Sequence, residues 1–341
     1  MGSTDSDSDF RSETFSSPAL FSGEYLVKEE ITKSHDSSFG GRRAKALLVP
    51  KLLWLFQHTP PVITMLPVRF IILLLRALYV LPQNPWRQSC EYICKIAERA
   101  GHSHRPSRVY QQLLSNMAGA VYNYSCLYGH GYEAALARVT LADEDGERLN
   151  RLAEEHGGVM VMVAHNFDTV FSMLKLDTAV PLLPIVRNPA TIERTRAALD
   201  CYERMKVTVI MVRGGNPIEL SRTLFSVLKK GNIVVAPVDL PDRSKARVEI
   251  EMFGKPVGLP NWAAKIAARR QVPVVPAYIS SSAEGSSFAF GEHIISEDVE
   301  EVMRHYTRYF EQGILRDPAS WAFLADKSWI KILRRISRDA A

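Results

Sequence analysis

A histidine and an aspartate stand three residues apart at the end of an uninterrupted apolar run. His165 directly follows the segment VMVMVA, which starts at residue 159, and Asp168 comes three positions later. An imidazole has an ordinary pKa of about 6.5, so it suits removal of a proton from an alcohol near neutral pH. A carboxylate on the other ring nitrogen fixes the tautomer and stabilises the imidazolium as it forms. The pattern therefore predicts His165 as a general base and Asp168 as the acid that orients it.

A structural interpretation of the same residues stays open. Asp168 lies where an acid in the first turn of a helix interacts with backbone N–H groups and with the helix dipole. Asn166 is a candidate cap for that helix, and a histidine after a buried strand is often structural. The residue types alone do not separate the two interpretations.

More polar side chains follow the later apolar runs of the chain. In open α/β sheets, ligands bind at the edge where the carboxyl ends of the strands meet. Guanidinium groups at this edge hold phosphate or carboxylate through planar, charge-assisted hydrogen bonds. We expect Asp239 and Arg243 either to contact substrate or to pair with each other and organise the site. The residues that we assign to substrate binding are Arg187, Asn188, Arg213, Asp239, Asp242 and Arg243.

The elements that must position these residues are short apolar strands separated by helices. Strand patterns occupy 159–164, 182–186, 207–212, 233–238, 248–253 and 273–279. Helix patterns with Asn-Pro openings lie between them, at 188–205 and 216–231. Continuous apolar strands that alternate with helices indicate a sheet covered on both faces. The predicted fold class is α/β, with a mixed, largely parallel sheet covered by helices.

The N-terminal third of the chain differs from the rest in amino-acid composition. Residues 1–43 are rich in Ser, Asp and Glu and cannot bury enough apolar surface to fold, so we expect a disordered tail. Residues 46–82 are strongly apolar, but prolines and charged side chains interrupt them, among them Arg69 and Arg76. A bilayer span needs about 20 mostly uncharged residues, so spanning is not expected. We predict apolar helices that lie in the membrane interface, with a pair of core helices as the alternative.

The rest of the chain fits this organisation. We place a helical, membrane-associating region at 44–156 and an α/β core at 157–341, with 44–341 forming one structural unit. The net charge is +5, and the four cysteines fit neither a disulfide framework nor a zinc site, which favours a reducing compartment. The pair His102 and His104 lacks a nearby acid or thiol and is interpreted as part of a loop. The basic segment 331–338 resembles no nucleic-acid recognition module and is expected near anionic lipid.

An ordered set of landmarks carries a family resemblance. They are GGVMVMVAHN, PIVRNP, VRGGNP, LKKGNIVVAPVDLPDR, FGKPVGLPNWAAKIAARRQVPVVPAYI and DPASWAF. In this order they make residues ~46 to ~335 resemble the lipid A biosynthesis (late) acyltransferase family, within the lysophospholipid acyltransferase superfamily. The resemblance implies a histidine base, a packed helix at 261–270 under an acyl groove, and no bound metal or redox cofactor. It implies acyl transfer from an acyl carrier protein or coenzyme A thioester to a hydroxyl of a membrane glycolipid or lysolipid. The implied location is peripheral, on the cytoplasmic face of the inner membrane.

One position departs from the family pattern. The family has an acid separated from its histidine by four residues, and here that position is Val170. The C-terminal basic and aromatic cluster also differs, since it reads LADKSW at 324–329. These departures keep an alternative open, which is a catalytically inactive lipid-binding or membrane-scaffold protein on the same fold.

Overall fold

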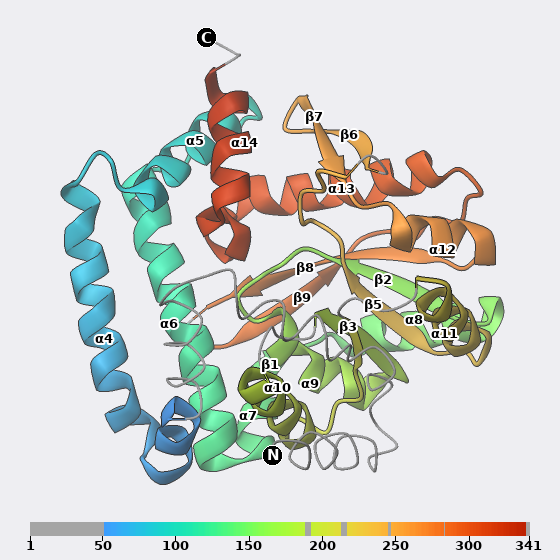
Figure 1. Ribbon diagram of the computed structural model, residues 1–341, viewed down its shortest axis with the longest axis horizontal. Coiled ribbons are helices and arrows are strands. Elements are labelled where there is room, and N and C mark those ends of the chain that lie inside the picture. The colour runs from blue at the N-terminus through green and yellow to red at the C-terminus, as the bar shows by residue number, and fades with distance from the viewer. Residues whose placement is uncertain (1–50, 188–191, 213–216, 245–246, 283, 339–341) are drawn as a thin grey trace, which may run out of the picture.

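Helices cover both faces of a seven-stranded sheet (Figure 1). The structure is a computed structural model, and it describes residues 51–187, 192–212, 217–244, 247–282 and 284–338. The predicted disordered tail at 1–43 lies outside these residues. The strands of the main sheet are β1 (Val139–Thr140), β2 (Val159–Val163), β3 (Leu182–Arg187), β4 (Ile210–Val212), β5 (Ile233–Pro237), β8 (Val274–Ser281) and β9 (Ser286–Phe290).

The strand order is β1-β9-β8-β2-β5-β3-β4, and this order decides which residues meet at the edge of the sheet. β2 lies between β5 and β8 and runs parallel to both. In the pairing of β2 with β5, Val159 lies opposite Ile233 and Val163 lies opposite Pro237. β8 and β9 form an antiparallel pair, so the predicted mixed, largely parallel α/β sheet is confirmed.

Two separate cores lie on the two faces of the sheet. Successive side chains of a strand point to opposite faces. Met160 and Met162 of β2 therefore pack into one core, whereas Val159, Val161 and Val163 pack into the other. Every residue of β2 is buried, as expected for a strand covered on both faces.

The connecting helices divide between these two cores. Helices on the side of Met160 are α5 (Pro85–Arg99), α11 (Pro217–Lys229), α12 (Trp262–Arg270), α13 (Val299–Arg316) and α14 (Lys327–Arg338). Helices on the opposite side are α7 (Tyr132–Leu136), α8 (Asp143–His156), α9 (Thr169–Ala179) and α10 (Ile192–Arg204). The long helix α6 (Pro106–His130) contributes side chains to both cores.

One predicted strand does not belong to the main sheet. Residues 248–253 form β6 (Val248–Met252), which pairs antiparallel with β7 (Lys255–Leu259) as a separate hairpin. Ile250 and Met252 are buried, while Glu249 and Glu251 are exposed. This alternation is typical of a strand with one solvated face, and it distinguishes β6 from the continuously apolar strands of the sheet.

The N-terminal region is joined to the core rather than separate from it. β1 lies within the predicted helical region at 44–156, yet it pairs with β9 at the edge of the main sheet. α6 includes Gly129 and ends at His130. Gly131 has φ = 85°, a left-handed conformation that glycine adopts readily at the end of a helix.

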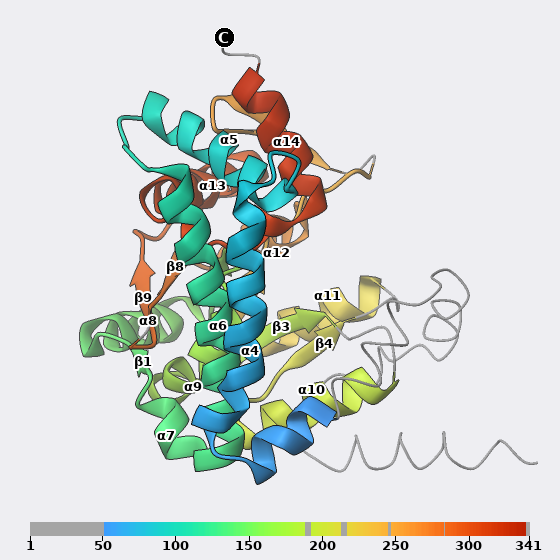
Figure 2. The ribbon, with the colours of Figure 1, turned by 90° about the vertical axis from the view of Figure 1, so that its left-hand side faces the viewer.

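Helix α4 (Pro61–Ala77) stands on the outside of the molecule and continues into the short 3₁₀ helix η2 (Leu78–Val80) (Figure 2). One side of α4 packs along α6, because the hydroxyl of Tyr110 donates to the Leu75 carbonyl and Arg76 donates to Ser115. The other side carries half of the exposed large apolar side chains among the described residues: Val62, Ile63, Leu66, Phe70, Ile71, Leu73 and Leu74. By length and composition alone, the segment Pro61–Val80 is the one described helix that could cross a membrane, and 17% of an apolar 18-residue stretch within it is buried.

Candidate functional site

His165 and Asp239 form the polar centre at the carboxyl edge of the sheet. Both residues stand two positions beyond the last pair of the β2–β5 register, Val163 and Pro237. Nδ1 of His165 is hydrogen-bonded to Oδ1 of Asp239, and the backbone N–H of His165 donates to Oδ2 over 2.9 Å. The Asp239 side chain is 1% exposed, whereas the His165 ring is 34% exposed. The pair thus joins a buried carboxylate to an imidazole with one open side.

The indole N–H groups of two tryptophans donate hydrogen bonds to Asp239. Trp321 Nε1 donates to Asp239 Oδ2 over 2.8 Å, and Trp329 Nε1 donates to the Asp239 backbone carbonyl over 3.0 Å. Both indoles are fully buried, and their rings pack edge to face with centroids 4.8 Å apart. The two carboxylate oxygens therefore accept three hydrogen bonds, which stabilises a buried charge that would otherwise be costly.

The segment that contains Trp321 also contacts His165 directly. It comprises the 3₁₀ helices η3 (Pro318–Ser320) and η4 (Ala322–Ala325). The backbone N–H of Ala322 donates to the His165 carbonyl over 2.8 Å, and the Phe323 ring stacks on the imidazole at a centroid distance of 4.3 Å. This segment fixes both the backbone and the ring of His165.

The expected contact between Asp168 and His165 is not formed, and this prediction is corrected. Asp168 precedes the first residue of α9 and makes no side-chain cap hydrogen bond. Asn166, the candidate cap, instead donates to the Ser320 carbonyl and accepts from the Ile279 backbone N–H. Its Oδ1 accepts a hydrogen bond from Asn123 Nδ2 over 3.0 Å, and burial raises the pKa of this carboxyl. Asn123 belongs to α6, whereas His165 contacts Asp239, two residues after the end of β5. Because the chain turns tightly after His165, the side chains of His165 and Asp168 contact different elements.

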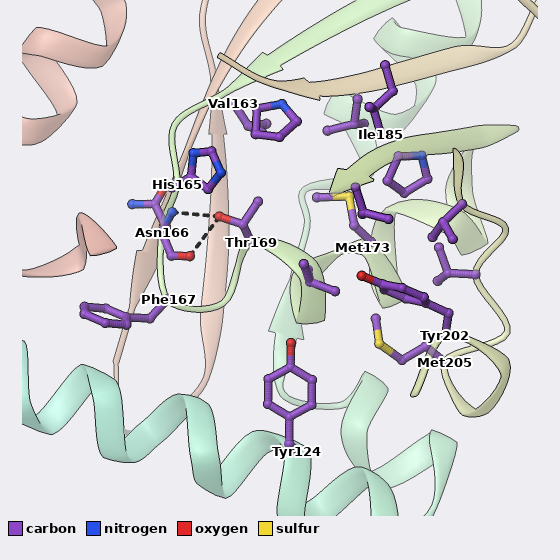
Figure 3. A pocket seen from close by; sticks show the side chains of 17 residues that line it. Tyr124, Val163, His165, Asn166, Phe167, Thr169, Met173, Ile185, Tyr202 and Met205 are labelled. Carbon is purple, nitrogen blue, oxygen red and sulfur yellow. Dashed lines mark hydrogen bonds between the residues drawn. The ribbon is translucent and has the colours of Figure 1, made fainter. Parts of the chain in front are cut away.

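A cavity of about 240 Å³ opens beside the His165 ring. Figure 3 shows His165 at one end of this cavity and Tyr202 and Met205 at the other, with Met173 between them. Its walls are largely apolar side chains from β2, β3, β5, α9 and α10. Val170, at the position where the family pattern has an acid, is one of the wall residues. The cavity is therefore suited to an apolar group that ends next to the imidazole.

The other titratable side chains of the cavity wall are two phenols. Burial raises the pKa of Tyr124 well above its ordinary value, and burial also raises the pKa of Tyr202. Both phenols therefore stay protonated near neutral pH and cannot act as bases. Among the described wall residues, His165 is the side chain that can accept a proton there.

The arginines predicted to bind substrate are described only in part. Arg187 ends β3 and lies opposite Val212 of β4 in the register, which places the residues after these two strands side by side. Asn188 and Arg213 lie outside the described residues. The position of the backbone is therefore compatible with the predicted anion site, and the roles of these side chains remain predictions.

Asp242 and Arg243 take up separate positions near the site. Asp242 accepts from the backbone N–H and the hydroxyl of Ser244, at 2.8 and 2.9 Å, and so closes a turn. Arg243 Nη2 lies 3.4 Å from the hydroxyl of Ser328. The expected pairing of Arg243 with Asp239 is not formed, because the Asp239 carboxylate contacts His165 and Trp321 instead.

Sequence reasoning placed Asp239 at the edge of the sheet but missed its partner and the indoles behind it. A signal for the His165–Asp239 pair was present, because VMVMVA and IVVAPV have equal length and each precedes one of the two residues. In parallel strands paired in register, residues at equivalent positions lie side by side. No comparable local signal connects Trp321 with Asp239, which is 82 residues away.

Comparison with known proteins identifies the family of this chain. A model of the bacterial lipid A biosynthesis acyltransferase family matches residues 133–329. This segment contains the sheet, His165, Asp239 and both indoles, whereas α4 and α6 precede it. A search of curated proteins found no match. The family match covers more than half of the chain, and the chain therefore belongs to the bacterial lipid A biosynthesis acyltransferase family.

Proposed function

We propose that this protein transfers a fatty acyl group from a thioester to a hydroxyl of a membrane glycolipid or lysolipid, with His165 as the general base. The observation that carries the proposal is the hydrogen bond between His165 Nδ1 and the buried Asp239, next to an apolar cavity. Family membership supports acyl transfer in general. The thioester, the acceptor and the residue roles are parts of the proposal.

The geometry suggests how the proton and the acyl group move. Because Nδ1–H donates to Asp239, Nε2 carries the lone pair that accepts the proton of the acceptor hydroxyl. The acceptor oxygen attacks the thioester carbonyl carbon, and the C–S bond breaks as the tetrahedral intermediate collapses. The imidazolium then returns its proton to the leaving thiolate. Asp239 does not take up the proton; it orients the ring and stabilises the imidazolium.

The substrates are assigned by the chemistry of the site. The acyl chain occupies the cavity between β2, α9 and α10, where its walls are apolar. An acyl carrier protein or coenzyme A supplies the thioester as a co-substrate. Arg187, Asn188 and Arg213 are proposed to hold an anionic group of one substrate at the neighbouring strand ends.

We further propose that α4 binds the protein peripherally to the cytoplasmic face of the inner membrane. Arg69 is the central residue of α4, so a spanning orientation would place a guanidinium at the centre of the bilayer. An orientation in the membrane plane instead immerses the exposed apolar side and leaves Arg69 and Arg76 near the lipid headgroups. The exposed cations of α14 are candidates for contacts with anionic lipid.

The decisive experiment measures acyl transfer by the purified protein. The assay supplies a long-chain acyl thioester and extracted bacterial lipids, and mass spectrometry follows both the free thiol and the acylated lipid. We expect His165→Ala to abolish transfer while binding of a fluorescent fatty acid is retained, since the cavity wall is otherwise unchanged. Transfer at the wild-type rate by His165→Ala would contradict the mechanism. Lipid binding by the wild-type protein without any turnover would favour the inactive scaffold.

A further inference from the structure

A second cavity, of about 430 Å³, lies apart from His165 between the start of α6 and the end of α13. Its wall includes His104, Arg105 and Arg108 from the α6 side and Arg316 from the end of α13. Asp317 is the one acidic side chain among the described wall residues. Of the two histidines noted in the sequence, His104 therefore borders a site rich in guanidinium groups, whereas His102 lines a different cavity. No group of three potential metal ligands occurs within the described residues.

The three guanidinium groups are not neutralised by the protein. Within the part of the chain that the structure describes, the guanidinium groups of Arg105, Arg108 and Arg316 form no ion pair or hydrogen bond. Asp317 is itself engaged, because its Oδ2 accepts from the hydroxyl of Ser320 over 2.6 Å. Three positive charges thus face a single carboxylate around one cavity, which favours an anion there.

Helix α6 adds its positive end to the same cavity. It is 25 residues long, has no side-chain cap and carries no acidic residue in its first turn. Four residues around its start line the cavity: Ser103, His104, Arg105 and Arg108. Unpaired N–H groups and the helix dipole at such an end attract negative charge, and here they add to the arginines.

We propose that this cavity binds a phosphate-bearing anion through Arg105, Arg108 and Arg316. Phosphate is the anion class that matches several planar guanidinium forks converging with a helix N-terminus. The site faces away from α4: Arg108 and Tyr110 are two residues apart, about 200° around α6, and Tyr110 contacts α4. A soluble phosphate can therefore enter while α4 lies on a bilayer.

The position of the cavity connects it with the reaction centre. Pro318 and Ala319 line the cavity, and the residues that follow them hold the His165–Asp239 pair. Asn116, whose neighbour Gln112 lines the cavity one turn away, donates to the Ala319 carbonyl over 3.0 Å. A phosphate bound by Arg316 restrains the first residue of the segment that runs from Arg316 to Phe323.

The test uses the full-length protein and inorganic pyrophosphate as the probe. Isothermal titration at fixed ionic strength gives the dissociation constant for wild type, Arg108→Gln, Arg316→Gln and the double variant. We expect a loss of about tenfold in affinity for each single change and about a hundredfold for both, since each removes one charge-assisted contact. Arg304→Gln is the matched control, because it removes an equal charge from α13 where Asp298 and Glu300 lie 3.7 Å from the guanidinium.

Two further measurements make the outcome decisive. Hydrogen exchange of the peptide spanning residues 316–324 is expected to slow on adding pyrophosphate to wild type and to stay unchanged in the double variant. Binding to vesicles with and without phosphatidic acid tests a lipid source of the phosphate. If pyrophosphate binding falls selectively in the variants, the anion is soluble; if only phosphatidic acid binding falls, it is a lipid headgroup. Equal binding of both probes by wild type and double variant, or no binding at all, overturns the proposal.

Discussion

Two buried aspartates near His165 differ in the groups that surround them. Asp239 faces the imidazole and an indole N–H, and both partners belong to the proposed reaction centre. Asp168 faces the amide of Asn123, whose Oδ1 in turn accepts from Arg138, and this network joins α6 to the start of α9. Their chemistry therefore follows from the neighbouring elements rather than from their distance to His165 in the sequence.

Substitution of the two aspartates separates these roles. Asp239→Asn is expected to lower kcat about a thousandfold, because an amide cannot stabilise the imidazolium and permits the wrong tautomer. Asp168→Asn keeps an oxygen for Asn123 and is expected to stay within about threefold of wild-type kcat/KM. Steady-state kinetics with the acyl thioester provide the measurement. A larger loss of kcat in Asp168→Asn than in Asp239→Asn would restore the pairing predicted from the sequence.

Trp321 is expected to act through the Asp239 carboxylate. Trp321→Phe removes the donor to Oδ2 and should lower kcat about tenfold with little change in KM, because the carboxylate loses one of its restraints. Trp329→Phe is the matched control, since its indole N–H donates to the Asp239 backbone carbonyl and not to the carboxylate. Each change is expected to reduce stability by about 1–3 kcal/mol, which urea unfolding measures. Equal kcat in the two variants would show a structural role alone.

At the scale of elements, the sequence predicted those whose pattern is strictly local. The continuous apolar runs gave β2, β3, β4, β5 and β8 because burial on both faces leaves no polar position. Residues 248–253 were misassigned to the main sheet, although their alternating glutamates indicate a solvated face. β1 and β9 were missed because two to five residues with few large apolar side chains carry little signal.

The orientation of α4 can be measured by spin labels at Ile63, Phe70 and Leu74. These positions share the exposed side of the helix. A helix in the membrane plane predicts equal depths for all three, whereas a spanning helix predicts depths that change by about 1.5 Å per residue along the axis. Oxygen accessibility in anionic vesicles gives the depth. The half-buried Cys201 is replaced by Ser beforehand, and a label at the exposed Ile295 serves as the control outside α4.

Asp177 near the end of α9 provides a prediction of pH dependence. Burial raises the pKa of this carboxyl to about 6. The folded protein thus holds this proton more tightly than the unfolded chain, so the associated stability is complete below pH ~4 and is lost as the pH rises through ~6. Asp177→Asn removes this loss and is expected to be more stable than wild type by on the order of 1–2 kcal/mol at pH 8. Urea unfolding of both proteins at pH 4 and pH 8 measures this gain. An equal difference in the free energy of unfolding between variant and wild type at the two pH values would contradict the prediction.

At the scale of the whole molecule, the site combines residues that are far apart in the chain. His165 and Asp239 meet because β2 and β5 are adjacent in the sheet, and Trp321 joins them from a segment after α13. Strand order of this kind depends on the packing of every helix between the strands, which no local pattern records. Sequence reasoning could therefore place each residue at the correct edge of the sheet but could not select its partner.

The separation of His165 from Asp239 also affects synthesis of the protein. A histidine whose acid comes from the same turn is complete once that turn forms. Here the hydrogen bond of His165 requires residue 239, and the hydrogen bonds to Asp239 require residues 321 and 329. A chain still emerging from the ribosome can already carry α4 and β2 while it lacks an oriented imidazole. For the proposed mechanism, an oriented base therefore arises only after residue 329 has been synthesised, when α4 has long been available for the proposed contact with the bilayer.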